Sequence, residues 1–404
     1  MAMLLIAIIY LAFISMGLPD ALLGAAWPSV FRQMGVSVSL AGLVTLLIAS
    51  GTVISSLLSD RLLRRFGTGW VTAGCTLLTA VALFGFSMST TFVHLCLWAL
   101  PYGLGAGSID AALNNYVALK YKSRHMSWIH FFWGVGVTAG PYIMGEALTG
   151  GAAWTEGYRV VGLLQTGMTL VLLASLPLWK RVGQPAPERE EGGALPLSRA
   201  QAVRLPGAMA ILMALFCYCG LESTVGLWAS SYMTLNRGVS AEVAARWASC
   251  YYLGVTLGRF VLGFVADRVG DRMMVRLGQS VILVGAALML IPMGNGVCFA
   301  GLLLMGIGCA PVYPCLLHET PVNFGRENSQ TLMGLQMACA YTGATLMPPL
   351  FGLIAQHISI AGYPVYLLVL GALMLVMAER MNAAQWARRT LVQEETHANQ
   401  GDTV

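Results

Sequence analysis

Twelve long apolar stretches constrain this sequence more strongly than any other feature. Each runs for about the 20 residues that a helix needs to cross the hydrocarbon core of a bilayer. The chain of 404 residues is 57% hydrophobic and 10% charged, whereas a soluble domain is typically about 25% charged. The pattern predicts an all-α integral membrane protein with transmembrane helices near residues 3–31, 38–59, 69–88, 92–119, 127–149, 158–179, 206–234, 242–266, 273–291, 297–318, 329–356 and 362–380.

The Lys and Arg residues are distributed unevenly between the two sides of these stretches. If the first stretch starts in the cytoplasm, 18 of the 23 Lys and Arg residues fall on the inner side, four on the outer side, and Arg259 within a stretch. Basic residues accumulate on the cytoplasmic side of a membrane. We therefore expect a multi-pass protein of the cell (inner or plasma) membrane with both termini in the cytoplasm. Loops that face anionic lipid account for the net charge of +5, so it does not indicate nucleic-acid binding.

A repeat relates the two halves of the chain. The pair Asp60-Arg61 returns 207 residues later as Asp267-Arg268, in each case after an apolar stretch. The same offset relates Gly136, Pro141 and Gly145 to Gly343, Pro348 and Gly352. Two patterns with one spacing indicate a duplicated unit, and in membrane transporters such repeats surround the substrate path. We expect an N-terminal six-helix bundle over 1–180, a cytoplasmic linker over 181–205, a C-terminal bundle over 206–381 and a cytoplasmic tail over 382–404.

Several classes of protein find no support in the residues. The sequence lacks a Gly-rich phosphate loop and shows no nucleophile–base pair, metal-ligand cluster or cofactor loop. The spacings of its nine Cys residues suggest neither a disulfide framework nor a metal site. We therefore predict no enzyme, no catalytic residue, no cofactor and no metal, and expect a monomer whose partners are a small-molecule substrate, protons and the lipid bilayer.

Several polar and aromatic residues inside the stretches form a recognisable set. They are Asp20, the run from Gly107 through Asp110 to Asn114-Asn115, the run His130-Phe131-Phe132-Trp133-Gly134, the pair Glu222 and Trp228, and the run Pro311-Val312-Tyr313-Pro314. With the repeated loop motif, this set resembles the major facilitator superfamily, in particular its branch of fucose permeases and glucose/mannose–proton symporters. The Asp267 copy of the loop motif matches closely, whereas the first copy has Ser56 and Leu63 where Gly is usual.

That resemblance implies the major facilitator fold, in which two bundles expose a central site to each side of the membrane in turn. In fucose permease a carboxylate in span 1 and another in span 4 serve sugar binding and proton coupling. Asp20 and Asp110 occupy the matching positions here, and Asp110 is shorter than the Glu that is frequent in span 4.

The residues themselves lead to similar candidates. An ionisable group at membrane depth costs about 2.5 to 3.5 kcal/mol on insertion scales, so Asp20, Asp110 and Glu222 are expected to bind protons or substrate. Asp110 lies near the midplane, one turn from Asn114, and the alternative is a static interhelical bond. The full set of expected substrate-binding residues is Asp20, Asp110, Asn114, His130, Trp133, Glu222, Trp228, Tyr313 and Gln336.

Two other groups are assigned structural or gating roles. Arg259 is expected to snorkel towards the cytoplasm and bond the end of a neighbouring helix, although an anion-binding role would suit an organic-anion carrier. Asp60 is expected to bond exposed amides at a neighbouring helix start, as part of a cytoplasmic gate. The expected gating residues are Asp60, Arg61, Arg64, Arg65, Asp267, Arg268 and Arg272.

Three functions fit these observations. The leading hypothesis is secondary active transport of a small solute, most specifically a monosaccharide with protons, by alternating access. The second is a proton-driven exporter of a drug or metabolite. The third is a nutrient sensor that binds its ligand without moving it. Substrate, direction of flux and coupling ion are not determined by the residues.

Overall fold

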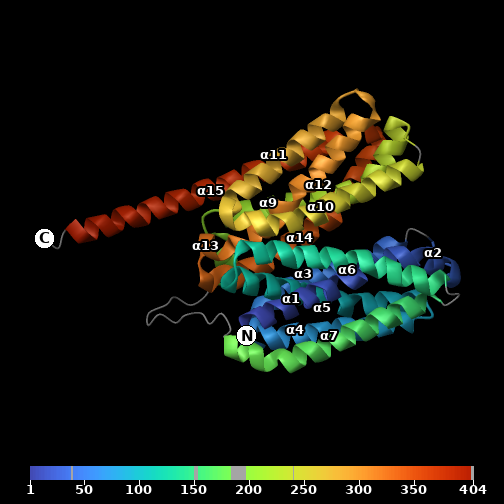
Figure 1. Cartoon of the computed structure of the whole chain (residues 1–404), viewed down its shortest axis with the longest axis horizontal. Helices are drawn as coiled ribbons and strands as arrows, with labels where there is room; N and C mark the ends of the chain where they lie inside the picture. The colour runs from blue at the N-terminus through green and yellow to red at the C-terminus, as the bar shows by residue number, and fades with distance from the viewer. Residues whose placement is uncertain (38–39, 150–152, 183–196, 240, 402–404) are drawn as a thin grey trace.

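A computed structural model describes residues 1–37, 40–149, 153–182, 197–239 and 241–401, and all regular secondary structure within these ranges is helical (Figure 1). The predicted linker lies mostly outside the described residues, apart from its ends. The short helix α8 (Arg199–Val203) begins in the second of these ends with a capping box between Ser198 and Gln201.

Each of the twelve predicted stretches coincides with a long helix, except that the first is divided into two. The N-terminal bundle consists of α1 (Ala2–Asp20), α2 (Leu22–Met34), α3 (Ala41–Phe66), α4 (Thr68–Ser87), α5 (Phe92–Lys120), α6 (Ser123–Thr149) and α7 (Trp154–Val182). The C-terminal bundle consists of α9 (Ala208–Arg237), α10 (Ala241–Val269), α11 (Asp271–Leu290), α12 (Gly294–His318), the short α13 (Thr320–Phe324), α14 (Arg326–Ile354) and α15 (Tyr363–Gly401). Helix α15 continues into the predicted tail as far as Gly401 and projects from the bundle (Figure 1).

Nine stretches of the described residues are long and apolar enough to cross a membrane, and the last of them, Arg326–Arg388, contains α14 and most of α15. Helices α6 and α10 are not among the nine. These two helices contact each other across the boundary between the bundles. Both helices carry buried polar or charged residues, such as His125 and His130 on α6 and Arg259 on α10, which make them less apolar.

The contacts between the bundles follow the sequence repeat. Helix α3 contacts α14, and α6 contacts α10. The repeat relates α3 to α10 and α6 to α14, so each contact is the counterpart of the other. Figure 1 shows the two bundles as separate layers that meet along these helices.

The repeated glycines explain a close crossing within each bundle. A Cβ atom added at Gly136 of α6 would lie 3.0 Å from the Cα atom of Gly17 in α1. One added at Gly343 of α14 would lie 3.0 Å from the Cα atom of Phe216 in α9. Both positions therefore need a residue without a side chain, because close backbone approach leaves no room for one.

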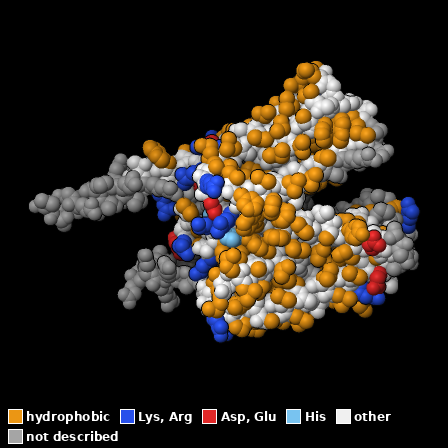
Figure 2. All heavy atoms as spheres, viewed as in Figure 1, with side chains coloured by type: hydrophobic (Ala, Val, Ile, Leu, Met, Phe, Trp, Pro, Cys, Tyr) orange, Lys and Arg blue, Asp and Glu red, His pale blue; other side chains and the backbone are white. Residues whose placement is uncertain are grey.

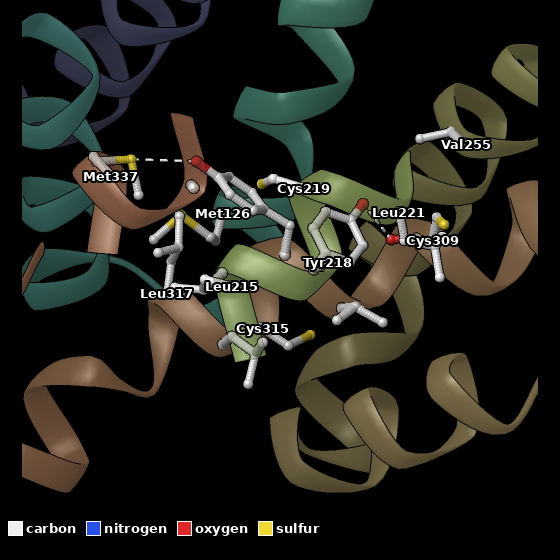
Figure 3. Close-up of a cluster of buried hydrophobic side chains, with 14 of the residues drawn as sticks. Met126, Leu215, Tyr218, Cys219, Leu221, Val255, Cys309, Cys315, Leu317 and Met337 are labelled. Atoms are coloured by element: carbon white, nitrogen blue, oxygen red, sulfur yellow. Dashed lines mark hydrogen bonds between the residues drawn. The ribbon is translucent and has the colours of Figure 1, made fainter. Parts of the chain in front are cut away.

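The end of the molecule that carries the loop motifs is here called the basic end. Blue Lys and Arg side chains gather there on the visible face in Figure 2. An apolar cluster joins the bundles near this end: in Figure 3, Met126 of α6 points among Leu215, Leu317 and Met337 of the C-terminal bundle. Met126, Leu317 and Met337 are fully buried. We call this cluster the apolar floor.

Candidate substrate cavity

A cavity of about 570 Å³ lies between the two bundles, on the other side of the apolar floor from the basic end. In Figure 2 the two lobes of the molecule separate at the end opposite the basic residues. Polar and aromatic residues of the lining come from both bundles: Asp20, Tyr102, Asp110, His130, Trp133 and Gln165 from the first, and Glu222, Arg259, Tyr313 and Tyr341 from the second.

Polar contacts hold the bundles together at the basic end. The carboxylate of Asp267 accepts a hydrogen bond from the backbone N–H of Arg124, at 3.2 Å, and lies 3.6 Å from the Nε atom of the same residue. Asp271 bonds the hydroxyl of Ser123 and, at 2.6 Å, the Nδ1 atom of His318. The Nε2 atom of His318 lies 3.1 Å from the carbonyl oxygen of Tyr121. The described structure is therefore closed at the basic end and open at the other.

A break in the first apolar stretch places Asp20 in the cavity. Pro19 lacks the N–H that would bond the carbonyl of Ser15, and this carbonyl instead accepts a hydrogen bond of 2.9 Å from the Nε2 atom of Gln165. Helix α1 ends at Asp20 and α2 begins at Leu22. The side chain of Asp20 is exposed to the cavity.

Two neutral donors hold the Asp20 carboxylate. Its Oδ1 atom accepts from the hydroxyl of Tyr102 at 3.0 Å, and its Oδ2 atom accepts from the indole N–H of Trp133 at 2.9 Å. Neither partner carries a charge, so the carboxylate lacks a counter-ion among these bonds and remains able to bind a proton or a hydroxyl group of a solute.

Asp110 is the centre of a chain of hydrogen bonds that crosses between the bundles. Its Oδ2 atom accepts from the hydroxyl of Tyr341 in α14 at 2.7 Å, and its Oδ1 atom accepts from the Nδ2 atom of Asn114 at 2.7 Å. The other end of the Asn114 amide faces His130, with 3.1 Å between Oδ1 and Nε2. Because the amide oxygen can only accept, Nε2 of His130 carries the proton in this arrangement.

On the opposite wall, Glu222 of α9 forms an ion pair with Arg259 of α10. The Nη2 atom of Arg259 lies 3.0 Å from Oε1 of Glu222 and 3.4 Å from the hydroxyl of Tyr218. The guanidinium carbon lies 6.0 Å from the ring centre of Trp133, across the boundary between the bundles. The expectation that Arg259 snorkels towards the basic end is wrong, because its charge is satisfied by Glu222 inside the protein.

Four expected substrate-binding residues remain. Tyr313 lines the described cavity, whereas Asn114, Trp228 and Gln336 do not. The ring of Tyr313 packs edge-on against His130 with 4.9 Å between centres. Asn114 is fully buried behind Asp110. Trp228 donates to the carbonyl of Pro348 at 3.0 Å, and Gln336 bonds the hydroxyl of Thr320. In both cases a neighbour in the same bundle satisfies the polar group of the side chain. Neither side chain therefore needs a solute as its hydrogen-bond partner.

The two copies of the loop motif make different contacts. Asp267 bonds the start of α6, which is the contact that the sequence suggested for Asp60. That expectation for Asp60 is wrong in this structure, because its carboxylate pairs with Arg64 one turn along the same helix. The hollow beside this pair is lined by Asp60, Arg61, Arg64, Arg65, Leu197, Ser198 and Arg199.

The other members of the expected gate lie near the surface of their own bundles. Arg65 stacks on the ring of Phe66, with 5.3 Å from the guanidinium carbon to the ring centre. Arg272 bonds Glu319 and Asn323, each at 3.1 Å, within the C-terminal bundle. Arg268 is exposed. The gating role of the set remains a prediction.

Several lining residues were not assigned to the site from the sequence, among them Tyr102, Tyr341 and Gln165. Arg259 was considered for it only as the alternative to a structural role. Tyr102 lies eight residues before Asp110 on α5, and could have been found as a residue on the same helical face. The approach of Tyr341 to Asp110 depends on how the bundles dock, and no local pattern reveals it.

The family to which these features belong is established by comparison with known proteins. The sequence model of the Major Facilitator Superfamily matches residues 9–245 and 211–396. The chain therefore belongs to this superfamily, and it is a membrane transporter rather than an enzyme.

Among the sequence relatives is Bypass of stop codon protein 6 of Saccharomyces cerevisiae, which is 23% identical over 278 residues. The match covers 63% of this chain and 56% of that protein, so the chain spans little more than half the length of this relative.

Solved structures confirm the fold. The human organic anion transporter MFSD10 superposes with a TM-score of 0.72 at 17% identity, over 93% of this chain and 98% of that one. The Escherichia coli fucose:proton symporter FucP superposes with a TM-score of 0.72 at 15% identity, over 94% and 97% of the two chains. The fold expected from the resemblance to the fucose permease branch is thus confirmed.

Proposed function

We propose that this chain moves a small hydroxylated solute, most specifically a monosaccharide, together with protons across the cell membrane by alternating access. The observation that carries the proposal is the hydrogen bond of 2.7 Å from Tyr341 to Asp110. It joins the two bundles at a group that can bind a proton, and Asp110 and Tyr341 both line the cavity. Proton binding, solute binding and bundle contact therefore meet at one carboxylate.

The chemistry of the cycle follows from that arrangement. A hydrogen bond to an ionised carboxylate is roughly twice as strong as one to a neutral acceptor. Protonation of Asp110 therefore weakens its bond to Tyr341, and a solute hydroxyl can replace the phenol. Asp20 offers a second carboxylate, and the rings of Trp133 and Tyr313 offer apolar faces to the C–H side of a sugar.

The orientation of the protein completes the proposal. The excess of Lys and Arg at the basic end is the pattern of a cytoplasmic surface. With that end in the cytoplasm, the described structure faces outwards and both termini are cytoplasmic. We propose that the chain acts as a monomer, because the cavity is formed by its own two bundles. Fucose:proton symport by a protein of the same fold supports sugar as the substrate, whereas an organic anion transporter of that fold supports an anionic one.

Uptake into proteoliposomes tests the proposal. Radiolabelled monosaccharides, first selected by thermal stabilisation of the purified protein, are supplied with and without an imposed proton gradient. We expect gradient-driven uptake to fall about tenfold, or about 1.4 kcal/mol, in Asp110→Asn, with solute exchange at equal pH retained. The matched control is Glu379→Gln, which alters an exposed ion pair with Arg276.

Three outcomes would contradict this function. Uptake in the wild type that ignores the proton gradient would exclude proton symport. A gene deletion that raises sensitivity to toxic compounds, without impairing use of any sugar, would favour the proton-driven exporter. Stabilisation by a sugar without transport in either direction would favour the nutrient sensor.

A further inference from the structure

The ion pair between Arg259 and Glu222 differs from an ordinary structural salt bridge. The Arg259 side chain is 4% exposed and the Glu222 side chain 23% exposed, and both residues line the cavity. Arg259 uses a single nitrogen, Nη2, for its bonds to Glu222 and Tyr218. Its Nε atom is buried and has no hydrogen-bond partner.

A second Arg–Glu pair in the same bundle is bidentate and serves as a comparison. Arg276 holds Glu379 through two parallel bonds, from Nε at 2.6 Å and from Nη2 at 2.7 Å. A guanidinium presents five donors in a planar fork that matches the two oxygens of a carboxylate. Arg276 binds Glu379 through two nitrogens of this fork. Arg259 binds Glu222 through one nitrogen only, so its other N–H groups remain available to a second carboxylate.

A buried donor without a partner is unfavourable, so Arg259 favours a ligand that supplies an acceptor to its guanidinium. Arg259 is the one Lys or Arg among the described residues that line this cavity. The acidic residues of the lining are Asp20, Asp110 and Glu222. A neutral solute gives the Arg259 fork no negatively charged partner, whereas a carboxylate fits it.

We infer that Arg259 receives a carboxylate of the transported solute, and that Glu222 occupies the guanidinium only in the empty carrier. This inference rests on the proposed function and narrows its substrate class to a hydroxylated carboxylic acid, such as a monosaccharide that carries an acid group. The carboxylate binds Arg259 on the C-terminal bundle, and the hydroxyls reach Asp20 and Asp110 on the N-terminal bundle. Such a solute bridges the two bundles.

The exchange of partners requires Glu222 to leave Arg259 when the solute carboxylate arrives. The titratable groups near Glu222 are Tyr218 and Cys219 on its own helix, Arg259, Tyr251 and Tyr252 on α10, and Cys309 and Tyr313 on α12. His130 faces Arg259 from α6. Among them, Arg259 carries the opposite charge, so the solute carboxylate competes with Glu222 alone for the guanidinium.

Binding to the purified full-length protein tests the inference with matched solutes. D-glucose and D-galactose are compared with D-glucuronate and D-galacturonate, which differ by the carboxylate at C6, and with D-gluconate and D-galactonate. The readout is the shift of the unfolding temperature, checked by titration calorimetry. We expect at least one acid to bind at least tenfold more tightly than its neutral counterpart.

Three variants separate recognition from folding. Arg259→Gln removes the charge and Arg259→Lys keeps the charge but loses the fork; we expect both to lose the preference for the acid. Glu222→Gln removes the competing charge, and we expect it to bind the acid at least as tightly as the wild type does. Glu379→Gln, in the bidentate pair with Arg276, should bind the acid as the wild type does.

The outcomes separate this inference from the proposed function. Equal binding of acids and neutral sugars, no response to any of the acids, or unchanged preference in Arg259→Lys overturns the inference. Proton-driven uptake of neutral sugars with unchanged kinetics in Arg259→Gln overturns it while the proposed function stands. Selective binding of an acid that is lost in both Arg259 variants, without gradient-driven uptake, supports the inference and contradicts proton symport.

Discussion

The two walls of the cavity satisfy their charges in different ways. On the N-terminal wall, Asp20 and Asp110 accept hydrogen bonds from neutral donors, and one of these donors, Tyr341, belongs to the other bundle. On the C-terminal wall, Glu222 has a full counter-ion in Arg259. The duplicated fold therefore supports two unlike surfaces, which suits a solute with two unlike ends. The predictions below test this difference, from the largest expected effect to the smallest.

Removing both carboxylates of the N-terminal wall should have the largest effect. We expect Asp20→Asn combined with Asp110→Asn to reduce proton-driven uptake about 100-fold, equivalent to about 2.7 kcal/mol, since no acid remains on that wall to carry a proton. Uptake into proteoliposomes at a fixed gradient measures it, and the unfolding temperature verifies that the protein is intact. A folded double variant with more than half of the wild-type uptake would contradict the assignment.

Removing the bond between the walls should have the next largest effect. Tyr341→Phe deletes one hydrogen bond to a charged group, worth about 1.5 to 3 kcal/mol, and should shift the protein away from the described conformation. Spin labels on the two bundles report this shift as a change in their distance distribution. Tyr366→Phe is the control, because that hydroxyl bonds the Met347 carbonyl within one bundle. Identical distributions in the two variants would count against Tyr341 as a link.

A comparison of two tryptophans tests which of them faces the solute. Trp133→Phe loses the bond to Asp20, whereas Trp228→Phe loses the bond to the Pro348 carbonyl, away from the cavity. We expect the first to weaken solute binding about fivefold, or about 1 kcal/mol, and the second to leave it unchanged. Titration calorimetry measures both affinities, and a larger loss in Trp228→Phe would reverse the assignment.

The smallest effect is expected at the loop motifs. Asp267→Asn weakens a contact between the bundles, whereas Asp60→Asn weakens a pair within one helix. Exposed ion pairs contribute about 0 to 1 kcal/mol, so we expect Asp267→Asn to increase cysteine labelling at the basic end about twofold and Asp60→Asn to leave it unchanged. Equal labelling in both would mean that the two copies act alike.

Much of the fold could be predicted from the sequence, because lipid imposes long apolar helices and the repeat at Asp60 and Asp267 marks their duplication. Membrane depth likewise singled out Asp20, Asp110 and Glu222, all of which line the cavity. The partners of these acids could not be predicted. Tyr341 reaches Asp110 only through the docking of two bundles, and Arg259 turns towards Glu222 instead of the membrane surface.

The apolar floor has a consequence for the speed of the transport cycle. Opening the basic end must bring Met126, Leu317 and Met337, which are fully buried here, into contact with water. Hydration of apolar surface raises the heat capacity, so the opening step has a positive activation heat capacity and its Eyring plot curves. The side chains of Met126 and Met337 are flexible and can pack in more than one rotamer. The basic end can therefore close tightly again without restoring a single side-chain arrangement.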